Sequence, residues 1–266
     1  MKKLIAAFFL LVSSLCHAKQ TAFFDNDLKQ LLEVMAVSHD GTPKSIVDAT
    51  QKKWIRPAGK ERWEVEDTLT TPQRNAVIDF CNKKGFFREI KPAHHDYDYA
   101  LILGATVLRM EKRMSYLAKL AEAGVHFKKV ILLSGARPLD ASVEAIPEGC
   151  KTECDAMEYL WKAQPLSKQV AWKHYQHPMV IMAEGKTRRP TTADTFALWM
   201  KDSPQPGRCF FVSNQPYCFY QQAVAENLMP STFVFETVGA AAEASSQNAA
   251  VMLDTIARCL YESNKR

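Results

Sequence analysis

The sequence Tyr99-Ala-Leu-Ile-Leu-Gly104 is the first of five short apolar runs that each end in a small or polar residue. The other four are Val130-Ile-Leu-Leu-Ser-Gly135, Val180-Ile-Met-Ala-Glu-Gly185, Phe210-Phe-Val-Ser-Asn214 and Thr232-Phe-Val-Phe-Glu-Thr237. Apolar runs of this length, alternating with longer helical patterns, are typical of strands buried on both faces of a parallel sheet. They predict an α/β protein with a mainly parallel five-stranded sheet.

Helical patterns follow these runs, at residues 108–123, 152–161, 192–200, 221–228 and 245–261. Strands and helices together make successive β-α units, which predict a three-layer, Rossmann-like sandwich over residues 97–266. Residues 19–96 have a different pattern, with helices expected near residues 24–35 and 71–81. We interpret them as a helical extension packed on the main domain. Its tryptophans, Trp54 and Trp63, could instead line a ligand site.

The amino terminus has the pattern of a signal peptide. Met1-Lys-Lys3 precedes an apolar run from Leu4 to Val12, and a small-x-small pattern ends at Ala18. We expect cleavage after Ala18, which makes residues 1–18 the signal peptide. The apolar run is too short for a comfortable membrane span, so the mature protein is expected in the periplasm or outside the cell, with no stable transmembrane segment.

Charge and cysteine content narrow the class of partner. Loss of Lys2 and Lys3 with the signal peptide lowers the formal net charge from +5 to +3, and no basic stripe interleaves with aromatic residues, so nucleic acid is not the expected partner. Six cysteines remain, an even number that permits disulfides in an oxidising compartment. Cys150 and Cys154 could pair, but such a motif without further ligands does not indicate zinc. The segment His94-His-Asp-Tyr-Asp98 is interpreted as a polar linker rather than a metal site.

Ligands of open parallel sheets bind just beyond the carboxyl ends of the strands. The candidates at those ends are Gly104, Ser134, Gly135, Glu184, Ser213 and Asn214. Near the start of its predicted helix, Glu153 could stabilise the helix dipole or turn inward as a base.

A second candidate feature is the basic loop that contains Lys186, Arg188 and Arg189. The loop leads into Thr191-Thr-Ala-Asp-Thr195 at a helix amino terminus, a plausible cradle for phosphate or carboxylate. The same residues also fit an alternative in which a solvated loop leads into a helix that one of the threonines caps.

Common catalytic and nucleotide motifs are absent. The chain has no GxGxxG after the first run and no GxxxxGK[ST], so neither a standard dinucleotide site nor a P-loop is indicated. It also has no GxSxG elbow and no HExxH helix. The cofactor therefore stays unknown at this level.

Several short pieces occur together in a recognisable order. They are Leu103-Gly104, Arg113 before an Ala- and Leu-rich helix ending at Gly124, Ser134-Gly135, Glu153 with Met157, Glu184, Thr192-Ala-Asp194-Thr195 and Phe210-Phe-Val-Ser213. In these pieces the chain resembles the YdcF/SanA/ElyC-like family of bacterial envelope domains of unknown function, over residues 97 to 229.

The resemblance implies a Rossmann-like fold whose turns form one site, with Arg113 facing inward beside Glu153, Thr192 and Asp194. In that family one class of members is linked to S-adenosylmethionine binding, and others to peptidoglycan or lipid-carrier homeostasis. The chain departs from the family after the fourth run, where Tyr217 and Tyr220 replace a histidine and an arginine.

We therefore expect an exported envelope protein that binds a small anionic or nucleotide-like ligand, with S-adenosylmethionine as a family-based candidate. A hydrolase or transferase acting on a phosphate-containing envelope precursor is the enzymatic version of this hypothesis. Glu153 and Asp194 are the predicted acid or base. The predicted ligand-binding residues are Gly104, Arg113, Ser134, Gly135, Glu184, Arg189, Thr192, Thr195, Ser213, Asn214 and Tyr217. The alternative is a non-catalytic binding or interaction protein with a degenerate site.

Overall fold

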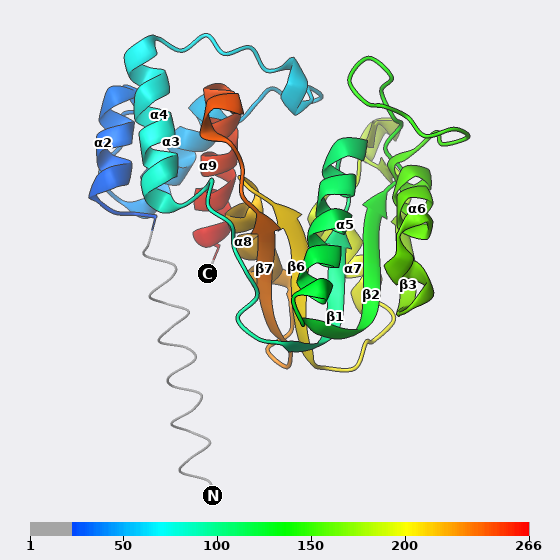
Figure 1. Cartoon of the computed structure of the whole chain (residues 1–266). Coiled ribbons are helices and arrows are strands. Elements are labelled where there is room, and N and C mark those ends of the chain that lie inside the picture. The colour runs from blue at the N-terminus through cyan, green and yellow to red at the C-terminus, as the bar shows by residue number, and fades with distance from the viewer. Residues whose placement is uncertain (1–22, 266) are drawn as a thin grey trace, which may run out of the picture. The chain divides into compact units, whose positions relative to one another are not determined.

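The computed structural model describes residues 23–265, apart from the side chain of Glu184, and divides into two compact units (Figure 1). The sheet unit comprises residues 58–64 and 86–245. The helical unit comprises the described residues of 23–57, 65–85 and 246–265. The predicted signal peptide lies outside the described residues.

The sheet unit is built on five parallel strands in the order β3-β2-β1-β6-β7 (Figure 1). Their bounds are β1 Asp96–Leu103, β2 His126–Gly135, β3 Ala171–His177, β6 Arg208–Asn214 and β7 Val234–Ala240. This confirms the predicted α/β class with a Rossmann-like parallel sheet. The strand order reverses between β1 and β6, so the chain leaves these two strands toward opposite faces of the sheet, and ligands of such sheets commonly bind at this switch point.

Helices cover both faces of the sheet and complete the three layers (Figure 1). They are α5 Val107–Glu122 and α6 Glu153–Ala163 on one face, and α7 Thr192–Met200 and α8 Cys218–Leu228 on the other. Successive residues of a strand point to opposite faces, so Ile102 packs with α5 and α6 while Leu101 packs with α7 and α8. This alternation explains why the runs are apolar throughout.

The third predicted strand, Val180 to Gly185, is wrong. The third strand of the sheet is β3, nine residues earlier, and Val180–Ile181 (β4) instead pairs antiparallel with Thr187–Arg188 (β5) in a small hairpin. Ile181 is 78% exposed, whereas β3 is an edge strand with alternating burial. An edge strand needs few apolar residues, so β3 escaped a search for apolar runs.

The helical unit consists of four helices, and the last of them comes from the other end of the chain. Its helices are α2 Asn26–Val34, α3 Pro43–Trp54, α4 Thr71–Lys84 and α9 Ala249–Ser263. Short 3-10 helices elsewhere are η1 Arg62–Glu64, η2 Pro165–Lys168, η3 Ala183–Gly185 and η4 Ala244–Ser246. Helix α9 packs on α3 and α4. The observed division thus differs from predicted domains of 19–96 and 97–266, since α9 joins the helical unit and residues 86–96 join the sheet unit.

Two observations bear on the predicted environment. Within residues 23–265, no helix is long and apolar enough to cross a membrane. All six cysteines of the described chain are free thiols, so the predicted option of a Cys150–Cys154 disulfide is not realised.

Candidate functional site

The carboxyl ends of β1, β2 and β6 bring glycine, polar and charged residues together. Gly104 follows β1, Gly135 ends β2 and Asn214 ends β6. Residues from α5, α6 and the loop before α7 reach the same region. We call this group of residues the edge cluster, and its charged members are Glu61, Arg62, Arg109, Arg113, Arg137, Glu144, Glu153 and Arg189.

Arg113 of α5 links the two strands at which the order reverses. Its Nη1 donates to the carbonyls of Leu103 (2.6 Å) and Gly104 (2.9 Å), and its Nε donates to Oδ1 of Asn214 (3.0 Å). The side chain is buried, and burial lowers the pKa of Arg113 to about 10. Among the described residues no carboxylate lies within ion-pair distance of it. Arg113 therefore brings a buried positive charge to the switch point, which a bound anion would stabilise.

Glu153, the first residue of α6, turns inward against two glycines. Its Oε1 accepts the backbone N–H of Gly135 (3.3 Å), and its Oε2 accepts Nε of Arg137 (3.2 Å). A Cβ atom at Gly104 would lie 2.1 Å from Oε1, so only glycine fits there. Burial raises the pKa of Glu153, although Arg137 counteracts the shift. The carboxyl is thus poised for proton transfer better than an exposed glutamate would be.

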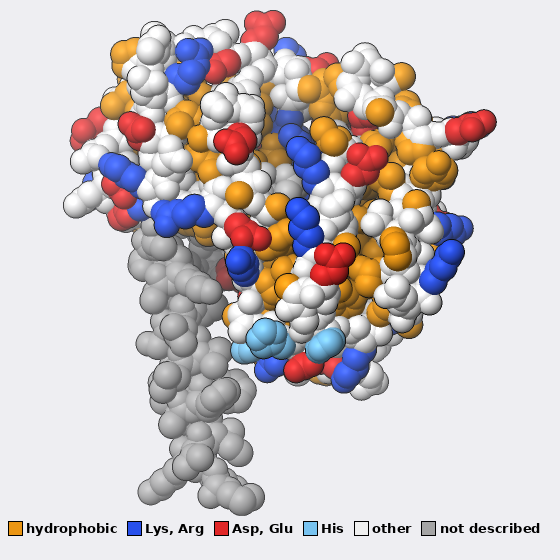
Figure 2. All heavy atoms as spheres, viewed as in Figure 1, with side chains coloured by type: hydrophobic (Ala, Val, Ile, Leu, Met, Phe, Trp, Pro, Cys, Tyr) orange, Lys and Arg blue, Asp and Glu red, His pale blue; other side chains and the backbone are white. Residues whose placement is uncertain are grey.

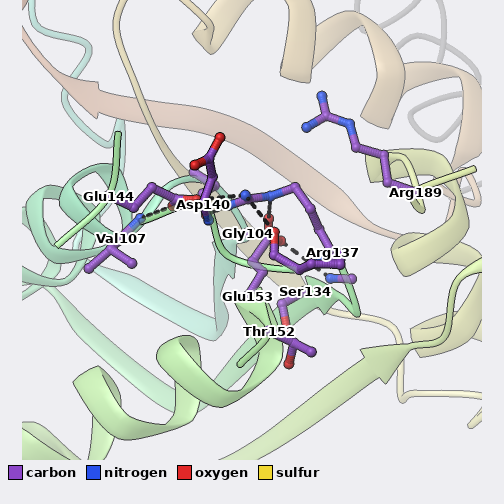
Figure 3. Close-up of polar contacts among 12 residues, drawn as sticks. Gly104, Val107, Ser134, Arg137, Asp140, Glu144, Thr152, Glu153 and Arg189 are labelled. Atoms are coloured by element: carbon purple, nitrogen blue, oxygen red, sulfur yellow. Dashed lines mark hydrogen bonds and ion pairs between the residues drawn. The ribbon is translucent and has the colours of Figure 1, made fainter. Parts of the chain in front are cut away.

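Arg137 and Glu144 form a buried pair that fixes the start of α5 (Figure 3). Nη1 and Nη2 of Arg137 donate to the two carboxylate oxygens of Glu144 at 2.7 and 3.0 Å. Glu144 also accepts the N–H of Val107 at 3.0 Å, which supplies the cap that Thr106 does not provide. Burial opposes its ionisation, but these hydrogen bonds hold the pKa of Glu144 below its ordinary value. Arg137 is therefore held in place to orient Glu153.

Tyr217 is contacted by two arginines. The guanidinium carbons of Arg62 and Arg109 lie 4.3 and 4.9 Å from the centroid of the Tyr217 ring. Nε of Arg62 is buried with no hydrogen-bond partner in the described chain. Burial, with the nearby charge of Arg62, lowers the pKa of Arg109. Neither arginine has a carboxylate within ion-pair distance among the described residues, so cation–π contact is their visible stabilisation.

Arg189 joins the edge cluster from the hairpin loop before α7. The next residue, Pro190, packs against Gly135, where an added Cβ would meet the proline ring at 2.9 Å. Nη1 of Arg189 pairs with Oε2 of Glu61 at 2.8 Å. Burial lowers the pKa of Arg189, and the charges of Glu153 and Arg137 also act on it. In Figure 3 its side chain lies near Arg137 without a bond to any residue drawn.

The charges of the edge cluster do not balance. Its five guanidinium groups face three carboxylates, which leaves two positive charges when all are ionised. The excess comes from Arg62, Arg109 and Arg113, which approach one another closely enough for each of the other two to lower the pKa of Arg113. An arrangement with unpaired, partly buried guanidinium groups suits an anion with several oxygens, such as a phosphate.

Ser134 has the partners of a catalytic triad but not the access. Its Oγ lies 2.7 Å from Nε2 of His174, whose Nδ1 lies 3.4 Å from Oε2 of Glu158. Burial lowers the pKa of His174, and Oγ also contacts Sγ of Cys154 at 3.2 Å. Ser134 is only 1% exposed, so a substrate cannot reach its hydroxyl. This network holds β3 and α6 against β2.

Several predicted site residues lie outside the edge cluster. Asp194 accepts hydrogen bonds from Arg188 (2.7 Å) and from the N–H of Thr191 (2.6 Å), as part of the capping box of α7. These bonds hold the pKa of Asp194 far below its ordinary value, which does not suit a general acid or base. The structure thus realises the alternative of a capped helix at this position.

Some of the remaining predicted residues also lie outside the edge cluster, and others belong to it. Thr195 bonds to the carbonyl of Thr192 within α7, and Ser213 is fully buried. Glu184 lies in the hairpin between β4 and β5 and not at the end of a strand of the main sheet. Its prediction as a site residue depended on the third predicted strand, which is wrong. The members that meet in the edge cluster or its immediate frame are Gly104, Arg113, Ser134, Gly135, Glu153, Arg189, Asn214 and Tyr217.

Glu61, Arg62, Arg109, Arg137 and Glu144 were missed by sequence reasoning. One available signal was the spacing of Arg109 and Arg113, which lie four residues apart and therefore share a face of α5. Arg137 directly follows a predicted strand end. Glu61, Arg62 and Glu144 carry no such signal, because they come from irregular or short 3-10 segments whose path depends on tertiary packing.

The opposite, amino edge of the sheet carries exposed histidines. His94, His95 and His126 lie at the starts of β1 and β2, where Figure 2 shows pale blue side chains at the foot of the sheet unit. Within the described part of the chain, no group of three or more histidine, cysteine or acidic residues is placed to hold a metal ion.

No family model, curated protein or solved structure matches this chain. The resemblance to the YdcF/SanA/ElyC-like family therefore stays a prediction from the sequence. What the fold and the edge cluster define is an α/β protein with an arginine-rich group at the switch point of a parallel sheet.

Proposed function

We propose that this chain is an exported, envelope-associated protein that binds a small anionic ligand with phosphate groups, such as a nucleotide-like molecule, at the carboxyl edge of its sheet. The observation that carries the proposal is the set of three arginines, Arg62, Arg109 and Arg113, which have no carboxylate partner among the described residues. Partly buried charges are costly unless something pairs with them. A phosphate would supply the missing negative charge and several acceptors.

Glu153 gives this site a route to chemistry. Its carboxyl belongs to the edge cluster, and its raised pKa lets it exchange a proton nearer neutral pH than an ordinary glutamate. In the enzymatic form of the proposal, Glu153 takes the proton of an attacking water or hydroxyl as its oxygen bonds to phosphorus, and the arginines stabilise the phosphoryl oxygens. The bond from phosphorus to the leaving phosphate or alcohol oxygen breaks, and that oxygen takes up a proton from solvent. The reaction class is a hydrolase or transferase acting on a phosphate-containing envelope precursor.

The test is calorimetric titration of the purified mature protein with inorganic pyrophosphate. We expect Arg109→Gln and Arg113→Gln each to weaken binding about tenfold or more, because the first removes a charged donor and the second a buried positive charge close to it. Lys112→Gln is the matched control, since Lys112 is exposed on the same helix and its loss removes the same charge. Thermal melting verifies that each variant is folded.

Two outcomes would contradict parts of the proposal. Equal binding by Arg109→Gln and Lys112→Gln would show that net charge, not the edge cluster, attracts the anion. Hydrolysis of a phosphate anhydride that is unchanged in Glu153→Gln would remove Glu153 from the chemistry while leaving the binding proposal intact.

A further inference from the structure

Residues 58–64 are a short segment that belongs with the sheet unit, although the residues on either side of it belong to the helical unit. The segment begins with a turn at Ala58 and Gly59, and it ends in the 3-10 helix η1. We call residues 58–64 the strap. Because the strap belongs to the sheet unit, its side chains can take part in the edge cluster.

Three consecutive strap residues contact the edge cluster. Glu61 pairs with Arg189 at 2.8 Å, the Arg62 guanidinium lies over Tyr217, and the Trp63 ring lies 5.9 Å from the guanidinium carbon of Arg137. In a fully solvated connecting segment, three successive side chains would not each contact a different residue of the same site. The strap is therefore a component of the site rather than a passing connection.

The carboxylate of Glu61 interacts with Arg189 as the anionic group of a bound ligand would. Glu61 is the carboxylate that neutralises Arg189 in the described chain, and the two side chains stay 22% and 38% exposed. An ion pair with this much exposure is weak, because water competes for both partners. A ligand with a more highly charged group could therefore displace Glu61 from Arg189.

Arg62 adds a second, independent observation. Its Nε is buried and lacks a hydrogen-bond partner in the part of the chain that the structure describes. A buried donor without an acceptor is unfavourable, so such a group in a native protein calls for an explanation, and a bound anion that pairs with it is one. The strap thus contributes two adjacent features. Nε of Arg62 is a donor without an acceptor, and the carboxylate of Glu61 is an anionic group of the protein itself that neutralises Arg189.

We propose that the strap is autoinhibitory and that Glu61 occupies, on Arg189, the place of a second anionic group of the ligand. The ligand then carries two anionic groups, as a diphosphate does. One group binds at Arg62 and Arg109, where the buried charge of Arg113 also attracts it, and the other displaces Glu61. This inference rests on the proposed anion-binding function and specifies the ligand class for the same site.

The experiment compares pyrophosphate with inorganic phosphate on the full mature chain, by calorimetric titration at constant ionic strength. We expect Glu61→Gln to strengthen pyrophosphate binding about threefold to tenfold, because the internal competitor for Arg189 is lost. Phosphate binding should change less than twofold, since a single anionic group binds at the three unpaired arginines. Glu122→Gln is the control, because Glu122 is exposed on α5 and its loss changes the net charge equally.

Arg62→Gln separates a ligand contact from a structural role. We expect it to weaken the binding of both anions while the melting temperature stays near that of the control. Equal effects of Glu61→Gln and Glu122→Gln would overturn the autoinhibitory strap and leave anion binding standing. An equal gain for phosphate and pyrophosphate in Glu61→Gln would overturn the second anionic group. If neither anion binds any variant, the proposed function itself fails, and the inference fails with it.

Discussion

At the scale of single residues, Gly104 shows how an absent side chain shapes the site. The carboxylate of Glu153 lies where a Cβ atom of residue 104 would be, at 2.1 Å, and the carbonyl oxygen of Leu133 would lie at 3.1 Å. The close approach of α6 to the end of β1 therefore depends on glycine. Its backbone does not need a left-handed conformation, so space is the reason for this residue.

Replacement of Gly104 by alanine should force Glu153 away from Gly135 and Arg137. We expect the free energy of unfolding to fall by about 1–3 kcal/mol, as for other overpacked sites. In a Glu153→Ala background the same replacement should cost less, because the obstructing carboxylate is gone. Urea unfolding of the two single variants and the double variant measures this coupling. An equal cost of Gly104→Ala in both backgrounds would show that the two residues do not compete for space.

Two carboxyl groups should respond to pH with opposite signs. The pKa of Glu153 is raised above its ordinary value of 4.5, so the folded state holds this proton more tightly than the unfolded state. Stability relative to Glu153→Gln should therefore fall as pH rises through the window above about 4.5. Asp194, whose pKa is lowered from 3.8, stabilises the fold above that value and loses its contribution as pH falls further.

Urea unfolding of the wild type, Glu153→Gln and Asp194→Asn between pH 2 and 7 measures both trends. Each variant lacks one titrating group, so its difference from the wild type isolates that group. Slopes of the same sign for the two variants would mean that burial does not dominate at Glu153, or that Arg188 does not hold Asp194 ionised.

At the scale of elements, α9 shows how one buried charge ties distant segments together. Asp254 is 1% exposed and accepts bonds from Nη1 of Arg56 (2.8 Å) and Nε of Arg258 (3.0 Å). Arg56 follows α3, so this interaction joins segments that are 198 residues apart. The helical unit therefore combines an apolar core with a buried ionic contact.

Removal of that carboxylate should destabilise the helical unit strongly. We expect Asp254→Ala to lower the free energy of unfolding by about 3–5 kcal/mol, because the buried guanidinium of Arg56 loses this carboxylate. Asp48→Ala in α3 is the control, since the Lys44–Asp48 pair is largely exposed and should leave stability nearly unchanged. Chemical denaturation followed by helical circular dichroism measures both. Similar small losses for the two variants would mean that Arg56 finds solvent or another acceptor.

The strands also show which sequence signals can be trusted at this scale. Central strands such as β1 and β6 are buried on both faces, so their residues are apolar in sequence and were located well. The edge strand β3 alternates exposed and less exposed residues, and its polar letters concealed it. The apolar letters from Val180 onward belong instead to a partly exposed hairpin. Apolar content therefore located the middle of the sheet and misled at its edge.

At the scale of the whole molecule, segments from the two ends of the described chain belong to the same unit. Helix α9 joins helices formed before residue 86, and the strap at residues 58–64 leaves the helical unit to join the sheet unit. Sequence order alone suggested a simple succession of extension and domain. The two units instead exchange segments, and this exchange delivers Glu61 and Arg62 to the edge cluster.

Local sequence patterns were enough to predict the fold class and about half of the candidate site. Burial demands apolar letters, and close approach demands glycine, so the central strands, Gly104 and Gly135 could be found from local patterns. Arg113 was found through the family resemblance, and Glu153 through the resemblance and its place near a helix start. The other site residues depend on tertiary structure. It is also the tertiary structure that places Asp194 in a helix cap and Glu153 in the edge cluster. Charge pairing depends on distances between residues far apart in sequence, such as Glu61 and Arg189, and no local pattern contains those distances.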